Sequence, residues 1–203
     1  MTEIVALFGL VPLALLITSA PRWAIHVCLW FFTLYALYHL RRAPAFSWRR
    51  LWEGEGWPKD LKRSAVFRFL LLTPIMTALT LYLVPERFFR FPIERPVFWV
   101  AVMVLYPLLS VVPQEIMFRS FFFERYQSLL PRQGMMIAAS AFVFGLGHIM
   151  FHNWVSPTLS LIGGLIFASS FACHRSLKWA ALEHAAYGCF IFTLGLGWFF
   201  FAH

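Results

Sequence analysis

Apolar runs of membrane-spanning length recur along this chain, and only short polar breaks separate them. A helix needs about 20 mainly apolar residues to cross the hydrocarbon core of a bilayer. By that criterion we expect eight helical segments, which cover Ile4–Ala20, Trp23–Leu40, Ala65–Val84, Val97–Val112, Gln114–Leu130, Met135–Phe151, Val155–Cys173 and Trp179–Phe201. The sequence therefore predicts an all-α fold, a polytopic transmembrane bundle of about eight membrane helices.

The segment Val97–Leu130 allows two arrangements because Pro113 lies in its middle. Either two spans meet at a kink at Pro113, or one span is followed by a re-entrant or interfacial helix. In both arrangements the residues just after Pro113 lie in or near the membrane.

Composition excludes an ordinary soluble domain, since 61% of the 203 residues are hydrophobic and only 13% are charged. We expect one integral membrane domain over residues 1–203. Residues 1–96 supply N-terminal helices and a basic interfacial loop, and residues 97–203 supply a core that carries the polar motifs. The three cysteines are scattered in apolar segments without metal-type spacing, at Cys28, Cys173 and Cys189.

The net charge of +8 points to lipid contact rather than nucleic acid, because the basic residues cluster beside apolar runs. The largest polar break, Arg41–Arg63, is predicted to be cytoplasmic by the positive-inside rule. Its Trp48, Trp52 and Trp57 fit either an amphipathic segment at headgroup level or a solvated loop. Short loops favour a multi-pass protein of a bacterial inner (plasma) membrane.

The polar residues that stand out in this apolar chain begin with Glu115 and Arg119, which share a helix face at i and i+4. A charge at membrane depth is costly, so such residues are usually functional. His148 and His184 lie in two further apolar segments, and His152 and Asn153 follow His148. Two histidines and a glutamate on three apolar helices predict a shared site.

The motifs Gln114-Glu-Ile-Met-Phe-Arg119, Phe144-x-x-x-His148 and His184 before a closing apolar helix occur in a fixed order. In this respect the chain resembles the CAAX protease and bacteriocin-processing family of glutamic intramembrane endopeptidases. The resemblance covers about half of the chain, from Val97 to the C-terminus. It implies cleavage near the C-terminus of a membrane-associated protein or peptide substrate, without a cofactor.

The chain departs from that family at two positions. Gln114 replaces the first residue of a Glu-Glu pair that the family links to water activation, and Gly188 stands where the family has Asn. Asn153, the only asparagine in the chain, is a candidate for the missing amide, and His152 is a second supporting candidate.

Peptide hydrolysis needs a base for water, a group that stabilises the oxyanion and a donor for the leaving amine. Glu115 is the predicted base, and Arg119 favours its ionised form. His148 and His184 are assigned to water positioning and oxyanion stabilisation, and Gln114 to orienting water or the scissile amide. Two alternatives stay open: a zinc protease with Glu115, His148 and His184 as ligands, and a non-catalytic immunity or assembly factor whose polar cluster is structural.

Overall fold

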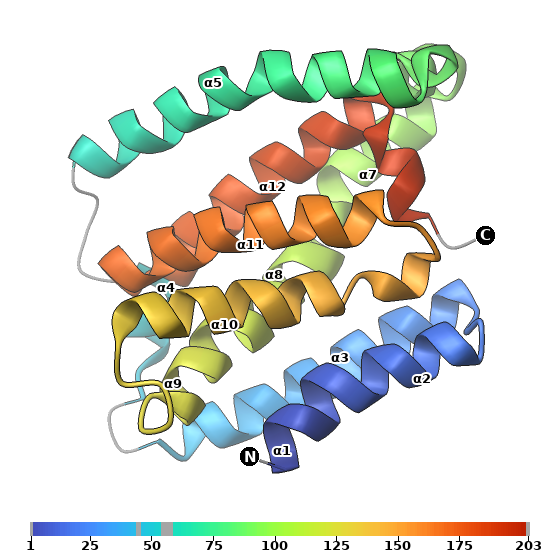
Figure 1. Cartoon of the computed structure of the whole chain (residues 1–203). Helices are drawn as coiled ribbons and strands as arrows, with labels where there is room; N and C mark the ends of the chain where they lie inside the picture. The colour runs from blue at the N-terminus through green and yellow to red at the C-terminus, as the bar shows by residue number, and fades with distance from the viewer. Residues whose placement is uncertain (1, 44–45, 54–58, 202–203) are drawn as a thin grey trace.

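The computed structural model describes residues 2–43, 46–53 and 59–201, and in those residues the chain forms helices without a β-strand (Figure 1). The elements are α1 (Thr2–Val5), α2 (Val11–Ile17), α3 (Arg22–Arg41), α4 (Trp48–Glu53), α5 (Lys59–Leu83), α6 (Arg90–Glu94), α7 (Pro96–Tyr106), α8 (Val112–Glu115), α9 (Phe122–Tyr126), α10 (Gln133–Leu146), α11 (Val155–His174) and α12 (Leu177–Leu194). Shorter π and 3₁₀ turns join several of them.

Five helices of the described residues are long and apolar enough to cross a membrane. They are Trp23–Arg41, Arg63–Leu83, Pro96–Tyr126, Gln133–Phe151 and Val155–His174. The predicted polytopic helical bundle is confirmed, and the chain is an integral multi-pass membrane protein. The number of long spans is smaller than eight, partly because the N-terminal helix Thr2–Ile17 is short.

Pro113 does not divide the chain into two spans. The helical path Pro96–Tyr126 is continuous over 31 residues, and it widens into π-helix at Pro107–Val111 and Ile116–Phe121. Proline removes a backbone donor and crowds the preceding turn, and a π-turn accommodates that loss without ending the helix. Our expectation of two kinked spans, or of a separate re-entrant helix, is therefore wrong in this segment.

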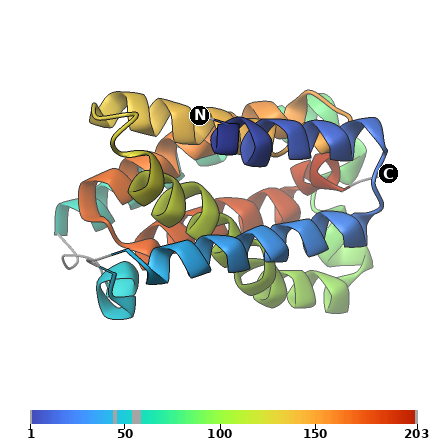
Figure 2. The same cartoon turned by 90° about the horizontal axis from the view of Figure 1, so that it is seen from below.

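The helices α10, α11 and α12 run side by side through the middle of the bundle (Figure 1). Gly164 of α11 allows this close approach, because a Cβ atom at that position would lie 3.0 Å from the Cα atom of Ala141 in α10. Figure 2 shows α3 alongside the α8–α9 segment. That segment is therefore enclosed by α3 on one side and by α10 and α12 on others.

The N-terminal helices are held to the same segment by aromatic packing. The ring of Phe8 lies 5.4 Å from the rings of both Phe118 and Phe122. The Thr33 hydroxyl of α3 donates to the carbonyls of Leu29, at 2.7 Å, and Pro113, at 3.4 Å. These contacts fix the rotation of the helix that carries Glu115 and Arg119.

The helix α5 lies along the outside of the bundle, next to α12 (Figure 1). Only 11% of the apolar membrane-span stretch in α5 is buried inside the bundle, whereas 44% of the stretch in α11 is buried. A salt bridge connects α5 to α12, since Arg68 Nη2 donates to Glu183 Oε1 at 2.7 Å. The Ser170 hydroxyl donates to the other oxygen of that carboxylate. Glu183, which has no partner recognisable from sequence, is thus paired across three helices.

The predicted interfacial segment of the basic loop contains the short helix α4. Trp48 and Trp52 are about half exposed, at 49% and 45%, and the Ser176 hydroxyl donates to the Trp52 carbonyl at 3.1 Å. Trp57 lies outside the described residues. The described part of this loop is therefore an aromatic helix docked by one hydrogen bond onto the turn before α12.

Candidate active site

The Glu115 carboxylate lies at the centre of the polar cluster and has no exposed surface. Its Oε1 atom accepts a hydrogen bond from His184 Nδ1 at 2.9 Å. Its Oε2 atom lies 3.3 Å from Arg119 Nε, an ion pair by distance that is not aligned as a hydrogen bond. The predicted i, i+4 pair is thus formed, and His184 from α12 joins it.

The Arg119 guanidinium is also fully buried. Its Nη1 atom donates to the Ser140 hydroxyl at 3.0 Å and to the Phe118 carbonyl at 3.3 Å. Its Cζ atom lies 4.8 Å from the centre of the Phe144 ring. Arg119 therefore balances the charge of Glu115 from the side that faces α10.

The His184 imidazole packs against two aromatic rings. It stacks on Phe167 with ring centres 4.5 Å apart and planes at 12°, and the edge of Phe144 approaches it at 5.4 Å. Because a carboxylate only accepts hydrogen bonds, His184 Nδ1 carries a proton. Its other nitrogen, Nε2, lies 3.2 Å from the hydroxyl of Tyr106.

The His148 imidazole is held in one tautomer by the backbone. Its Nδ1 atom lies 2.7 Å from the Phe144 carbonyl, which can only accept, so Nδ1 carries the proton. In neutral His148 the Nε2 atom is then an unprotonated acceptor. The Phe144 ring contacts both imidazoles, at 4.8 Å from His148 and 5.4 Å from His184.

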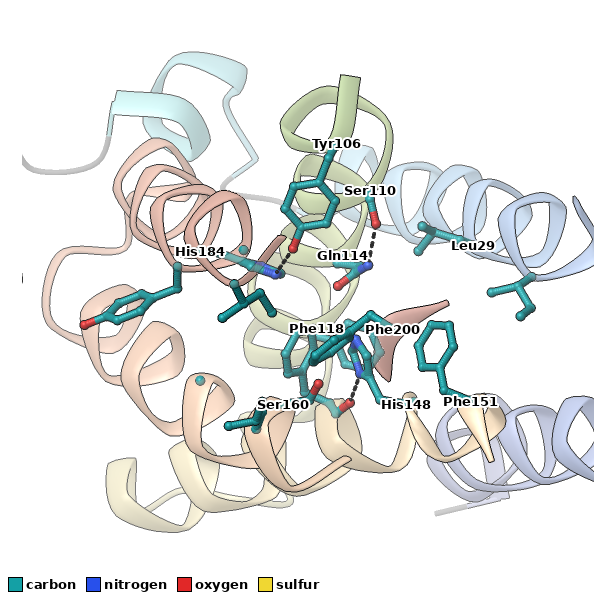
Figure 3. Close-up of a pocket in the computed structure, with 18 of the residues that line it drawn as sticks. Leu29, Tyr106, Ser110, Gln114, Phe118, His148, Phe151, Ser160, His184 and Phe200 are labelled. Atoms are coloured by element: carbon teal, nitrogen blue, oxygen red, sulfur yellow. Dashed lines mark hydrogen bonds between the residues drawn. The ribbon is translucent and has the colours of Figure 1, made fainter. Parts of the chain in front are cut away.

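A cavity of about 780 Å³ joins these groups, and its walls are mainly apolar. The polar side chains at its wall include Tyr106, Ser110, Gln114, His148 and His184 (Figure 3). Glu115 does not line the cavity, because its carboxylate lies behind His184. In the site predicted from the sequence, the imidazoles therefore face the cavity and the Glu115 carboxylate does not.

Gln114 occupies the position beside Glu115 that does face the cavity. Its amide nitrogen donates to the Ser110 hydroxyl at 2.8 Å (Figure 3). Its Oε1 atom is buried and accepts no hydrogen bond from the described residues. An acceptor without a donor at the wall of a cavity is suited to a water molecule or to a peptide N–H group.

The two supporting candidates lie outside the cavity wall. His152 is exposed and adopts a left-handed conformation with φ of 55°. The Asn153 amide nitrogen donates to the carbonyls of Phe151 and Phe199 at 3.0 and 2.8 Å, and its oxygen accepts from the Ser156 backbone at 2.8 Å. Asn153 thus organises the start of α11, and its hydrogen-bonding capacity is used there.

Tyr106 and Ser110 are site residues that the sequence did not indicate. A tyrosine or serine in a long apolar run is indistinguishable from a packing residue when no partner is known. Ser110 and Gln114 are four residues apart, a spacing that places them on one helix face. Tyr106 is eight residues before Gln114, which in a regular helix would place it near the same face. The π-turn at Pro107–Val111 changes the helical period between them, so this relation cannot be read from the spacing alone.

A zinc ion does not fit these side chains as arranged. His184 Nδ1 and Glu115 Oε1 bond directly to each other, and His148 Nδ1 bonds to the backbone. Within the part of the chain that the structure describes, no group of three His, Cys, Asp or Glu side chains is placed to hold a metal ion.

Comparison with known families agrees with this geometry. Residues 96–190 match the model of the family described as Type II CAAX prenyl endopeptidase Rce1-like. This segment is similar to that family. The match, slightly under half of the chain, includes Tyr106, Gln114, Glu115, His148 and His184. No curated protein and no solved structure matches the chain. The matched segment thus carries the whole polar cluster.

Proposed function

We propose that the protein is an intramembrane endopeptidase that hydrolyses a peptide bond near the C-terminus of a membrane-associated substrate. The observation that carries the proposal is the convergence of Gln114, His148 and His184 on one mainly apolar cavity. The match of residues 96–190 to an endopeptidase family model supports the same reaction class. The substrate is a peptide or an anchor helix held in the lipid bilayer.

His148 is the proposed base, because its Nε2 lone pair faces the cavity while Nδ1–H is committed to the Phe144 carbonyl. Water adds to the carbonyl carbon, its proton passes to His148 Nε2, and the carbonyl oxygen becomes an oxyanion. The C–N bond then breaks, and the proton on His148 passes to the leaving amine. The products are a new C-terminal carboxyl group and a free amino group.

Gln114 is proposed to orient the attacking water. Its free Oε1 atom is an acceptor at the cavity wall, and its amide nitrogen is already held by Ser110. A water that donates one hydrogen to Gln114 and the other to His148 directs its lone pair at a substrate carbonyl. Gln114 contributes position and no proton transfer, because an amide does not act as a base at neutral pH.

Glu115 takes a different role here from the base role expected from sequence. Since it lies behind His184 and off the cavity wall, we propose that it holds the imidazole in one tautomer and orientation, while Arg119 balances its charge. A carboxylate that orients a histidine acts in this way in many hydrolases. Its loss would then lower activity through His184.

The experiment presents a library of C-terminal membrane peptides to the purified protein and to three variants. We expect cleavage by the wild type, a fall of about 10²–10⁴-fold with His148→Gln, as for loss of a general base, and a smaller fall with Glu115→Ala. His152→Gln is the matched control, since it changes an exposed histidine four residues away. Full activity in His148→Gln would overturn the assigned mechanism.

A non-catalytic binding protein is a second candidate, and a specific observation favours it. The side chain that faces the cavity at position 114 is a neutral amide, and the adjacent carboxylate is fully buried. In that case the purified protein binds membrane peptides in the cavity and releases them intact. Gln114→Glu distinguishes the two candidates: in a hydrolase it adds a second base and raises the cleavage rate, whereas a binding protein still releases the peptides intact.

A further inference from the structure

Tyr106 and Gly188 fit together as a large and a small residue on facing helices. A Cβ atom placed on Gly188 would collide with the hydroxyl, Cε1 and Cζ atoms of Tyr106. The tyrosine side chain thus fills the space next to α12 into which a side chain at position 188 would project. The phenol hydroxyl therefore stands close to where a side chain at position 188 would reach.

The Tyr106 hydroxyl lies at the polar part of the cavity wall (Figure 3). It is 3.2 Å from His184 Nε2, and Phe192 packs edge-on against its ring with centres 5.1 Å apart. The ring is therefore held in place from α12, while rotation about the C–O bond leaves the hydroxyl hydrogen free to change direction.

We propose that Tyr106 is a catalytic residue whose hydroxyl donates a hydrogen bond to the oxyanion of the scissile carbonyl. The proposal rests on the endopeptidase function proposed above. Before substrate binds, the hydroxyl is paired with His184 Nε2 at 3.2 Å. When the carbonyl oxygen gains negative charge it becomes the stronger acceptor, because hydrogen bonds to ionised groups are about twice as strong as neutral ones.

The geometry also explains why this donor comes from α7. Gln114 donates one amide hydrogen to Ser110, which fixes the direction of its amide group, and Asn153 has three backbone partners away from the cavity. Arg119 is fully buried against Ser140 and Phe144. Among the polar groups described above, the Tyr106 hydroxyl is a donor that both lines the cavity and can redirect its hydrogen.

The first test compares Tyr106→Phe with the wild type on a peptide that the wild type cleaves. We expect kcat to fall about 10²–10³-fold, the usual effect of removing one oxyanion donor, with KM changed less than about threefold. Tyr126→Phe is the matched control, because it removes another buried hydroxyl outside the cavity. An unchanged kcat in Tyr106→Phe overturns the proposal, as does a change confined to KM.

The second test moves the donor from one helix to the other. Tyr106→Ala removes the donor and opens the space beside Gly188, and we expect it to lose activity. The double variant Tyr106→Ala/Gly188→Asn places an amide in that space and should recover at least tenfold in kcat over Tyr106→Ala. Absence of recovery in a folded double variant counts against a donor role at this place.

A third measurement separates this proposal from the endopeptidase function itself. A peptide phosphinate, a stable tetrahedral anion, and the matching uncleaved amide compete with a fluorescent membrane peptide for the protein. We expect Tyr106→Phe to lower the affinity for the phosphinate at least tenfold and the affinity for the amide less than twofold. This comparison holds even if the wild type shows no turnover. Equal weakening of both ligands, or no weakening of either, would show that the hydroxyl does not serve an anion.

Discussion

The buried pair Glu115–Arg119 should be strongly coupled in folding, and a double-mutant cycle measures the coupling. Glu115→Gln removes the charge but keeps an oxygen for His184 Nδ1, so its effect reports mainly on Arg119. Among the residues that the structure describes, Arg119 then keeps Ser140, the Phe118 carbonyl and the Phe144 ring as partners, and none of them carries a negative charge. Removing one partner of a buried ion pair typically costs about 3–5 kcal/mol.

The reverse change, Arg119→Met, leaves the fully buried Glu115 carboxylate with His184 as its partner. We expect the free energy of unfolding to fall by a similar amount, again about 3–5 kcal/mol. The double variant leaves neither charge, so it should be more stable than the two losses added together predict, by about 1–3 kcal/mol. The long, imperfectly aligned Nε–Oε2 contact of 3.3 Å favours the lower part of that range.

The assay is reversible unfolding in mixed detergent micelles, in which the fraction of denaturing detergent is raised and helix content is followed. Each variant's free energy of unfolding is compared with the wild type under the same conditions. Where a single variant is recovered poorly, a higher folded yield of the double variant gives the same information. Losses that add within about 0.5 kcal/mol would refute the reasoning, because uncoupled sites behave in that way.

Further predictions concern contacts outside this pair. Arg68→Met should destabilise the protein by about 1–3 kcal/mol, since it leaves the Glu183 carboxylate with Ser170 alone. Increased proteolysis of α5 in the same micelles would report this loss. Equal protection from proteolysis in the variant and the wild type would contradict it. Asn153→Ala should cost about 1–2 kcal/mol by removing the hydrogen bonds that organise the start of α11, without changing KM, and a KM effect alone would point to a substrate role instead. Gly188→Ala should lower activity in the presence of Tyr106, whose ring must shift, and unchanged cleavage by this variant would show that the space between α7 and α12 is less restricted than described.

The membrane bundle and the cluster of Glu115, Arg119 and His184 could be predicted because charge in an apolar sequence is a strong signal. The direction in which each side chain faces could not. Gln114 and Glu115 are adjacent in sequence, and which of them faces a cavity depends on the rotation of their helix. That rotation is set by distant contacts, such as Phe8 with Phe118 and Thr33 with the Pro113 carbonyl.

Tyr106 and Arg68 were missed for a related reason. Each is a single polar or aromatic group in an apolar run, and its importance comes from a partner about 80 or more residues away, His184 or Glu183. Local spacing carries no information on such pairs. The prediction at Pro113 was wrong for a different reason. A proline in a membrane helix often ends or kinks it, whereas here the π-turns on either side accommodate the loss of its backbone N–H donor.

Those wider turns have a consequence for how the site tolerates change in chain length. Successive residues of a regular helix are rotated by about 100°, and a π-turn holds one residue more than an α-turn. A deletion of one residue within Pro107–Val111 that turned the π-turn into an α-turn would therefore leave Gln114 and Glu115 at nearly the same rotation relative to Tyr106. Closing this segment into a regular α-helix at its present length would instead rotate them by about 100°. In that second case the carboxylate would point away from His184 while every side chain of the site was still present, so the proposed activity depends on the π-turn itself as much as on the side chains around it.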